Sequence, residues 1–192
     1  MREVQEAKVQ LVSVAHRAYS LRLQTGDGGN LSIRVPSQRL IVIKQSRCSF
    51  ADCSVENLVS VNFEGQIIDG DAKPSSELDT HLAIYEERPD IQAIFHCHSP
   101  WAIAFSNQNS EVPPLTYHVE AKLGQIPIIE APPAMTHKVV RPLLKKHPTL
   151  KAFVQRSHGI FAFDTSIERA FYHAELVEET SQIAYLIANK LN

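Results

Sequence analysis

The spacing of apolar residues predicts where helices and strands alternate along this chain. From Val4 to Leu21, apolar side chains recur every three or four residues, which is typical of one face of an amphipathic helix. A glycine-rich loop follows over 25–30. Apolar and polar residues then alternate with a period of two over 31–35, and a second apolar run covers 40–43. These two runs predict neighbouring strands.

The remaining elements follow from the same periodicities and from turn and cap residues. A hairpin turn is predicted at Asn62–Gly65, with a returning strand over 66–68. Further along we expect a helix from Ser75 or Ser76 to about Arg88, a buried strand at Ile91–Phe95, a helix begun by Ser99 and Pro100, a strand over Gln125–Glu130, a helix over Thr136–Lys146, a strand pair within Thr149–Phe163, and a last helix from about Ser166 with a Thr165–Glu168 capping box. No repeat or linker interrupts this pattern, so we expect a single domain over 1–192.

Composition and charge narrow the class of protein. Hydrophobic residues make up 44% of the chain and charged residues 21%, as in ordinary globular domains. The formal net charge is −2 and there is no basic block, which argues against a nucleic-acid or membrane-surface partner. No apolar run is long enough to span a bilayer, and Met1–Glu6 lacks the apolar core of a signal peptide. We therefore expect a cytoplasmic protein.

The strongest chemical signal is a pair of histidines at the end of a predicted strand. Side chains of a strand alternate between its faces, so His96 and His98 point the same way and Cys97 points the other. Two such imidazoles can share one metal ion, or they can be polar strand-end residues satisfied by water. His158, followed by Gly159, lies between two strand-like runs and can reach the same place. Three neutral imidazoles with one open position describe a catalytic zinc site.

Three other stretches carry candidate chemistry, each with a purely structural alternative. Asn30 follows a glycine and precedes a strand, where backbone can approach a ligand, although such turns are more often only turns. The polar loop Lys44–Ser49 offers a cation, hydroxyls and N–H groups to an anion, as solvated loops also do. Glu77 can act as a base or a ligand, or can simply favour a helix N-terminus.

Together these motifs resemble the class II aldolase/adducin-head family, and within it the L-fuculose-phosphate aldolase branch. The resemblance rests on four segments in the family's order and approximate spacing: Gly29–Ser32, Lys73–Glu77, His96–Ser99 and Ser157–Gly159. It implies an α/β fold, a three-layer α/β/α sandwich around a largely antiparallel sheet. It also implies a homotetramer with active sites at the subunit interfaces.

The resemblance further implies a role for each matching residue. His96, His98 and His158 match zinc ligands, with one zinc ion per subunit or another divalent metal in its place. Glu77 matches the acidic residue that joins the metal in the resting site and acts as the base, and Tyr117 matches a proton donor reaching in from a neighbouring subunit. The positions that match the substrate-phosphate site are Asn30, Ser46, Ser75 and Ser76.

The function implied is a zinc-dependent lyase that cleaves a phosphorylated ketose by a retro-aldol reaction through a metal-stabilised enediolate. Two alternatives share the scaffold: methylthioribulose-1-phosphate dehydratase and pentulose-phosphate 4-epimerase, for which Glu120 is a candidate acid or base. A third is a non-catalytic adducin-like module, which would lack the metal histidines. Two features depart from the aldolase pattern. Arg47 stands where the family has glycine, and the sequence to Asn192 has no counterpart of a second catalytic tyrosine in the longer tail of that branch.

Overall fold

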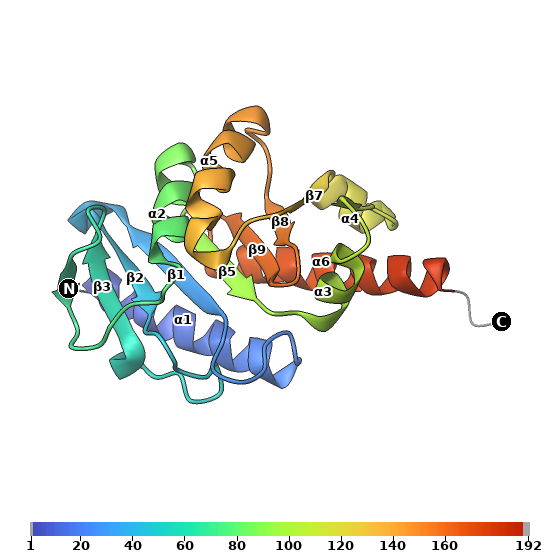
Figure 1. Ribbon diagram of the computed structural model, residues 1–192. Helices are drawn as coiled ribbons and strands as arrows, with labels where there is room; N and C mark the ends of the chain where they lie inside the picture. The colour runs from blue at the N-terminus through green and yellow to red at the C-terminus, as the bar shows by residue number, and fades with distance from the viewer. Residues whose placement is uncertain (1, 190–192) are drawn as a thin grey trace.

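The computed structural model describes residues 2–189, which form one nine-stranded sheet covered by helices on both faces (Figure 1). Residue 1 and residues 190–192, the ends of the predicted domain, lie outside the described residues. The helices are α1 (Arg2–Ser20), α2 (Leu78–Glu87), α3 (Pro100–Ser106), α4 (Tyr117–Lys122), α5 (Thr136–Lys146) and α6 (Ile167–Ala188), with 3-10 turns at Pro36–Gln38, Val55–Asn57 and Pro133–Met135. The strands are β1 (Asn30–Val35), β2 (Leu40–Lys44), β3 (Leu58–Asn62), β4 (Ile67–Asp69), β5 (Ala93–Cys97), β6 (Glu111–Val112), β7 (Ile126–Ile129), β8 (Ala152–Gln155) and β9 (Gly159–Asp164).

The sheet is mixed. Its strand order over the described residues is β4-β3-β2-β1-β5-β9-β8-β7-β6. Neighbouring strands run antiparallel except β7 and β8, which run parallel. The parallel pair occurs where α5 connects the two strands, because a helical crossover returns the chain in the same direction. The expected α/β/α sandwich is thus confirmed, with a mixed sheet in place of a largely antiparallel one.

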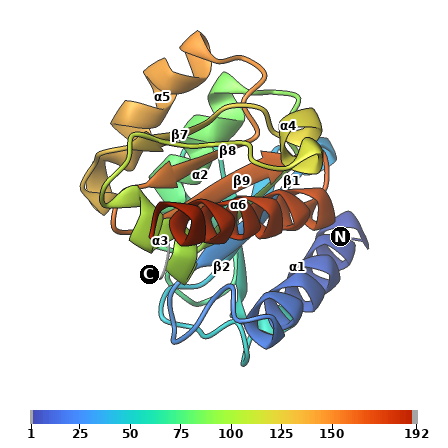
Figure 2. The same cartoon turned by 90° about the vertical axis from the view of Figure 1, so that its right-hand side faces the viewer.

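Two apolar clusters, one on each face of the sheet, hold the three layers together. In β5, Phe95 and Cys97 join the cluster made with α1, α3 and α6, whereas Ile94 joins the cluster made with α2 and α5. Figure 1 shows α2 and α5 on one side of the sheet, and Figure 2 shows α6 crossing the opposite side beside α1. His96 has the same strand parity as Ile94, so the predicted metal ligand faces the α2 and α5 layer.

Local sequence signals misplaced one helix cap and missed one short helix. Ser166, and not Thr165, is the N-cap of α6, and its Oγ accepts a hydrogen bond from the Arg169 N–H at 3.3 Å. The predicted capping box is therefore wrong. The Thr165 hydroxyl instead donates to Asp164 Oδ1 at 3.0 Å. Tyr117 begins the short helix α4, capped by Thr116, where the sequence pattern predicted no element.

No helix among residues 2–189 is long and apolar enough to cross a membrane.

The close approach of β5 and the start of β9 requires glycine at position 159. Gly159 has φ +152°, and a Cβ there would lie 2.1 Å from the Cys97 carbonyl oxygen. Backbone cannot move away as a flexible side chain can, so a larger residue would separate the two strands that carry the histidines.

We expect Gly159→Ala to lower the free energy of unfolding by at least about 2 kcal/mol, because it combines a disfavoured φ with a backbone clash. Gly124→Ala is the matched control, since Gly124 has φ +60° but open space around its Cβ position. Urea denaturation of both variants measures the difference. Equal losses would show that the contact with Cys97 carries no cost.

Candidate metal centre and active site

The three predicted metal ligands lie together at one end of the sheet. His96 is in β5, His98 follows that strand directly, and His158 lies in the turn between β8 and β9. β5 and β9 are paired neighbours, so the turn brings His158 beside His96, with ring centroids 5.0 Å apart. Cys97 packs on the other face, as the alternation predicted. One ligand atom from each histidine lies within 4.8 Å of the others.

The hydrogen bonding of His96 leaves a lone pair directed into this cluster. His96 Nδ1 lies 2.8 Å from the Ile160 carbonyl oxygen, which can only accept, so Nδ1 carries the proton. That leaves Nε2 as the ring nitrogen that can bind a metal ion, and it lies 3.2 Å from His98 Nε2. Burial, together with nearby His96 and His158, lowers the pKa of His98 to about 4, so His98 is neutral at pH 7. Neutral imidazoles converging in this way suit a divalent cation.

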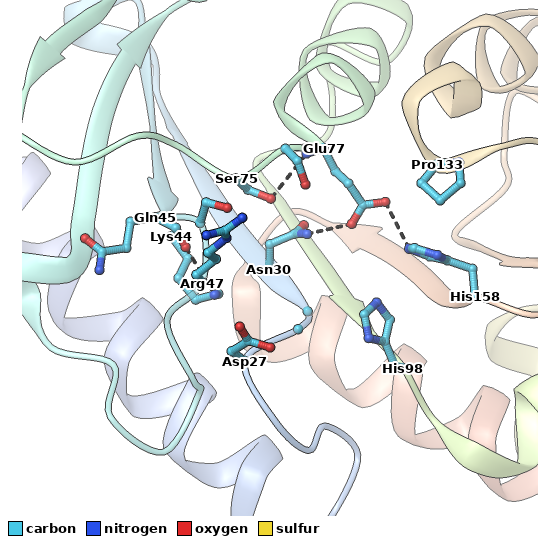
Figure 3. A pocket seen from close by; sticks show the side chains of 14 residues that line it. Asp27, Asn30, Lys44, Gln45, Arg47, Ser75, Glu77, His98, Pro133 and His158 are labelled. Carbon is cyan, nitrogen blue, oxygen red and sulfur yellow. Dashed lines mark hydrogen bonds and ion pairs between the residues drawn. The ribbon is translucent and has the colours of Figure 1, made fainter.

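Glu77 completes the cluster from the N-terminus of α2, in the helix layer that His96 faces. It occupies the N-cap position of α2, which begins at Leu78, so neither Ser75 nor Ser76 is the cap as the sequence predicted. Its carboxylate makes no cap hydrogen bond. Instead Oε2 lies 3.0 Å from His96 Nε2. Oε1 lies 3.2 Å from His158 Nε2, as Figure 3 shows. The contacts with histidines therefore explain the position of Glu77 better than the helix dipole does.

The surroundings of Glu77 keep its carboxylate ionised. The residue is only 6% exposed, and burial by itself disfavours the charge. The neighbouring histidines His96 and His158 outweigh that effect and hold the pKa of Glu77 below its ordinary value. Among the described residues, neither Glu77 Oε1 nor His158 Nε2 has a hydrogen-bond partner of good geometry, although both are buried. A cation held by the three histidines would satisfy both atoms, so the residues fit a bound metal.

A cavity of about 290 Å³ opens in front of these groups. Glu77, His98 and His158 line one part of it, and the loop after β2 lines another (Figure 3). The predicted substrate residues Asn30, Ser46, Ser75 and Ser76 all line this cavity. The structure therefore brings together predicted residues from five separate segments of the chain.

Backbone pairing between two loops places the anion-binding candidates. The Ser46 N–H donates to the Lys73 carbonyl at 2.9 Å, and the Ser75 N–H donates to the Lys44 carbonyl at 3.1 Å. Lys44 is 1% exposed and its ammonium group donates to the Cys48 carbonyl. Burial lowers the pKa of Lys44. The cavity thus has a buried cation and several hydroxyls at the end away from the histidines, which suits an anionic group.

Arg47, the residue that replaces a family glycine, adopts a left-handed conformation with φ +56°. The backbone thus keeps a conformation that favours glycine while the side chain adds a second cation to the cavity lining.

Tyr117 and Glu120 lie away from this cavity within one chain. Both are on α4, and neither lines the cavity. Tyr117 is 88% exposed, the most exposed of the large hydrophobic side chains in the described part of the chain. A tyrosine in that position can serve the site only from a neighbouring subunit.

Sequence reasoning set aside one buried histidine that belongs to the surroundings of the site. His81, for which the sequence pattern predicted no role, is fully buried in α2 and contacts Asn30 and Ser32 of β1. The sequence does contain a signal for this role, the spacing of polar residues along the helix. Glu77 and Tyr85 flank His81 at intervals of four residues, which places all three on one helix face. Matching that spacing to polar residues two apart in β1 required knowing that the two elements pack together.

Comparisons with known proteins agree over nearly the whole chain. Residues 9–185 match the family described as Class II Aldolase and Adducin N-terminal domain. A 5-deoxy-D-ribulose 1-phosphate aldolase from Bacillus thuringiensis is 31% identical over 95% of this chain and 85% of that protein. A 3-oxo-tetronate 4-phosphate decarboxylase from Escherichia coli is 26% identical over 97% of this chain and 89% of that protein. A solved L-fuculose 1-phosphate aldolase superposes with a TM-score of 0.87 at 26% identity, over 96% of this chain and 87% of that one.

The geometry predicts that metal retention depends on the histidine cluster. We expect purified protein to bind one zinc ion per chain, and His96→Ala or His158→Ala to weaken binding at least about 10-fold, because each removes a ligand. His173→Ala is the control, since His173 is a buried histidine paired with Asp164 away from the cluster. Metal analysis after dialysis against a graded chelator measures the effect. Undiminished zinc in both cluster variants would contradict the site.

Proposed function

The chain belongs to the Class II Aldolase and Adducin N-terminal domain family, and we propose that it is a metal-dependent lyase that cleaves a phosphorylated ketose by a retro-aldol reaction. The observation that carries this proposal is the placement of an ionised, buried Glu77 against three converging imidazoles at one end of a cavity whose other end is cationic and hydroxyl-rich. A substrate with a carbonyl at one end and a phosphate at the other matches that polarity. The matched aldolases named above act, by their names, on sugar phosphates.

We propose zinc as the ion held by His96, His98 and His158, because an all-imidazole donor set suits it. Bound there, it would polarise the ketose carbonyl as a Lewis acid and stabilise the negative charge that develops when the carbon–carbon bond breaks.

Glu77 is the proposed acid and base. In the synthetic direction its carboxylate takes a proton from the carbon beside the carbonyl, and in the cleavage direction it returns that proton to the same carbon. Its lowered pKa keeps it ionised. The contacts of Oε2 with Asn30 and His96 hold one oxygen, while Oε1 lies 3.2 Å from His158 Nε2, a second residue of the cavity lining.

The phosphate of the substrate would lie among Ser46, Ser75 and Ser76, with Lys44 and Arg47 supplying positive charge. Asn30 is more restricted than the resemblance implied. Its amide already donates one hydrogen bond to Glu77 Oε2 at 2.7 Å, so only its second amide N–H is free for a substrate oxygen.

Tyr117 is the proposed proton donor to the aldehyde oxygen in the synthetic direction, and it would act on the site of a neighbouring chain. Its 88% exposure and its separation from the cavity of its own chain support this placement. A homotetramer with interfacial sites, located in the cytoplasm as expected from the sequence, is part of the proposal.

Decarboxylation of a 3-oxo acid phosphate is the second candidate. Loss of carbon dioxide beside a carbonyl needs the same stabilisation of developing negative charge, and a relative named for that reaction is 26% identical. Arg47 favours it, since an exposed cation at the cavity could hold a substrate carboxylate. The dehydratase and epimerase alternatives use the same metal chemistry, whereas a non-catalytic module does not explain the three converging histidines.

Zinc-loaded protein incubated with a panel of ketose phosphates and one 3-oxo acid phosphate would separate these reactions. Retro-aldol cleavage splits a ketose phosphate into a triose phosphate and an aldehyde. Decarboxylation of a four-carbon 3-oxo acid phosphate gives a triose phosphate and carbon dioxide, whereas epimerisation or dehydration releases neither an aldehyde nor carbon dioxide. Release of an aldehyde together with triose phosphate, without carbon dioxide, is the expected result. A protein that binds zinc but changes no member of the panel would contradict the proposal.

Glu77→Gln should abolish most of the turnover without unfolding the protein. Gln keeps the shape of the side chain but cannot accept a proton, and positioned acid–base groups contribute about 10²–10⁴-fold, so kcat should fall by that order. Zinc content should persist because the three histidines remain. Glu120→Gln, on an exposed carboxylate of α4, is the control and should retain parent turnover. A Glu77→Gln protein with near-parent kcat would remove Glu77 from the mechanism.

Mixing two inactive variants should restore activity if sites form across subunit boundaries. Tyr117→Phe and Glu77→Gln each damage every site of their own oligomer. Subunits exchanged at random in equal amounts would pair an intact Glu77 with an intact Tyr117 in roughly a quarter of the sites of a cyclic assembly. Activity after dissociation and reassembly measures this. A fully active monomer, or no recovery in mixed oligomers, would contradict the placement of Tyr117.

A further inference from the structure

A row of polar residues on β1 faces a row of polar residues on α2 in the interior of the protein. On the strand the row is Asn30, Ser32 and Arg34, at intervals of two; on the helix it is Glu77, His81 and Tyr85, at intervals of four. These two periods place each row on one face of its element. Five of the six residues, all except Arg34, are at most 6% exposed.

The hydrogen bonds between the rows form a continuous path that ends on Glu77. Tyr85 Oη lies 2.8 Å from Ser32 Oγ, and Ser32 Oγ lies 2.7 Å from His81 Nδ1. His81 Nε2 lies 2.5 Å from Asn30 Oδ1, and Asn30 Nδ2 donates to Glu77 Oε2 at 2.7 Å. Tyr85 Oη also lies 3.1 Å from the Ser32 carbonyl oxygen, which can share the single Tyr85 proton with Ser32 Oγ.

Only one assignment of protons satisfies every member of this path. The Glu77 carboxylate accepts, so Asn30 must present its NH₂ group to it and its Oδ1 to His81. Oδ1 also only accepts, so His81 must carry its proton on Nε2. Nδ1 is then an acceptor, and the Ser32 hydroxyl must donate to it, which makes Tyr85 the donor to Ser32.

The opposite tautomer of His81 would break the path at two places. A bare Nε2 would face the Asn30 oxygen at 2.5 Å, lone pair against lone pair, unless the amide turned over. A turned amide would then place Oδ1 against the Glu77 carboxylate. Because these groups are buried, no bulk water would compensate the lost hydrogen bonds. Burial also lowers the pKa of His81 to about 3, so its ring is neutral.

We propose that His81 is a positioning residue for the reaction. Its Nε2–H tautomer, fixed by Ser32, orients the Asn30 amide, and the Asn30 amide in turn holds Glu77 Oε2. While Oε2 is held, rotation of the carboxylate is restricted and Oε1 stays beside His158 Nε2. His81 itself does not line the cavity. This inference rests on the proposed role of Glu77 as acid and base.

Two substitutions at His81 test the orientation. His81→Phe keeps a planar ring but cannot donate to Asn30, so kcat should fall about 10–100-fold because a displaced catalytic group loses its alignment. KM should change less than about 3-fold, because the phosphate end of the cavity is untouched. His81→Gln carries an amide N–H that can replace Nε2–H, and it should recover most of the lost kcat.

His173→Phe is the matched control. His173 is also a buried histidine on a helix, 4% exposed and bonded to Asp164, but it lies outside the path. It should lose thermal stability as His81→Phe does and keep parent kcat. Parent-like kcat in folded His81→Phe, or equal kcat losses in His81→Phe and His81→Gln, would overturn the proposal.

The tautomer is measurable in the unmodified protein, even where a variant fails to fold. Long-range proton–nitrogen correlation NMR of the zinc-loaded protein, labelled with ¹⁵N-histidine, identifies which ring nitrogen carries the proton. The His81 signal is assigned by its absence from His81→Gln. A neutral ring protonated on Nε2 is expected, and a proton on Nδ1 or on both nitrogens would overturn the proposal. If the parent protein changes no substrate of the panel, the lyase proposal fails, and the tautomer still decides whether the path exists.

Discussion

Glu77 is buried against His96 and His158, and a carboxylate in that position is stable only because proton donors and potential cation ligands surround it. Desolvation of a charge is costly unless partners compensate it. The compensation here comes from distant parts of the chain: Asn30 from β1, two histidines from the end of β5, and His158 from the β8–β9 turn. The same closeness that compensates the charge makes the carboxylate available to a substrate in the cavity.

The sheet supplies the rigidity that this arrangement needs. β5 lies between β1 and β9, so the three strand ends that carry Asn30, His96 and His158 are fixed to one another by backbone hydrogen bonds. The tight fit of Gly159 against Cys97 sets how close His158 comes to His96. Sites built on paired strands hold their geometry better than sites on free loops. The loop that bears Ser46 and Arg47 gains some of this rigidity from its backbone pairing with residues 73–75.

Differences among related lyases are expected at the parts of the site that the metal cluster does not constrain. Arg47 projects from a loop position with a glycine-like conformation. Arginine in place of the expected glycine therefore adds a side chain to the cavity without requiring a different backbone conformation. Tyr117 stands on the surface of α4, and its contribution depends on how chains assemble. The choice of substrate and of reaction therefore depends on groups at the edge of the cavity. Polarisation of the substrate carbonyl depends instead on the histidine cluster at the buried end of the cavity.

By itself, the sequence determined the elements with strong periodicity and the parity of side chains within each strand. The alternation in β5 was enough to place His96 and His98 on one face and Cys97 on the other, because that relation involves only neighbouring residues. The motif order also indicated the family and, with it, His158 and Glu77. Only the tertiary structure decided that the Glu77 side chain turns from its helix end toward the histidines and that His81 is buried against β1. Each of these depends on which elements pack together, and local sequence does not specify contacts between residues that are some fifty positions apart.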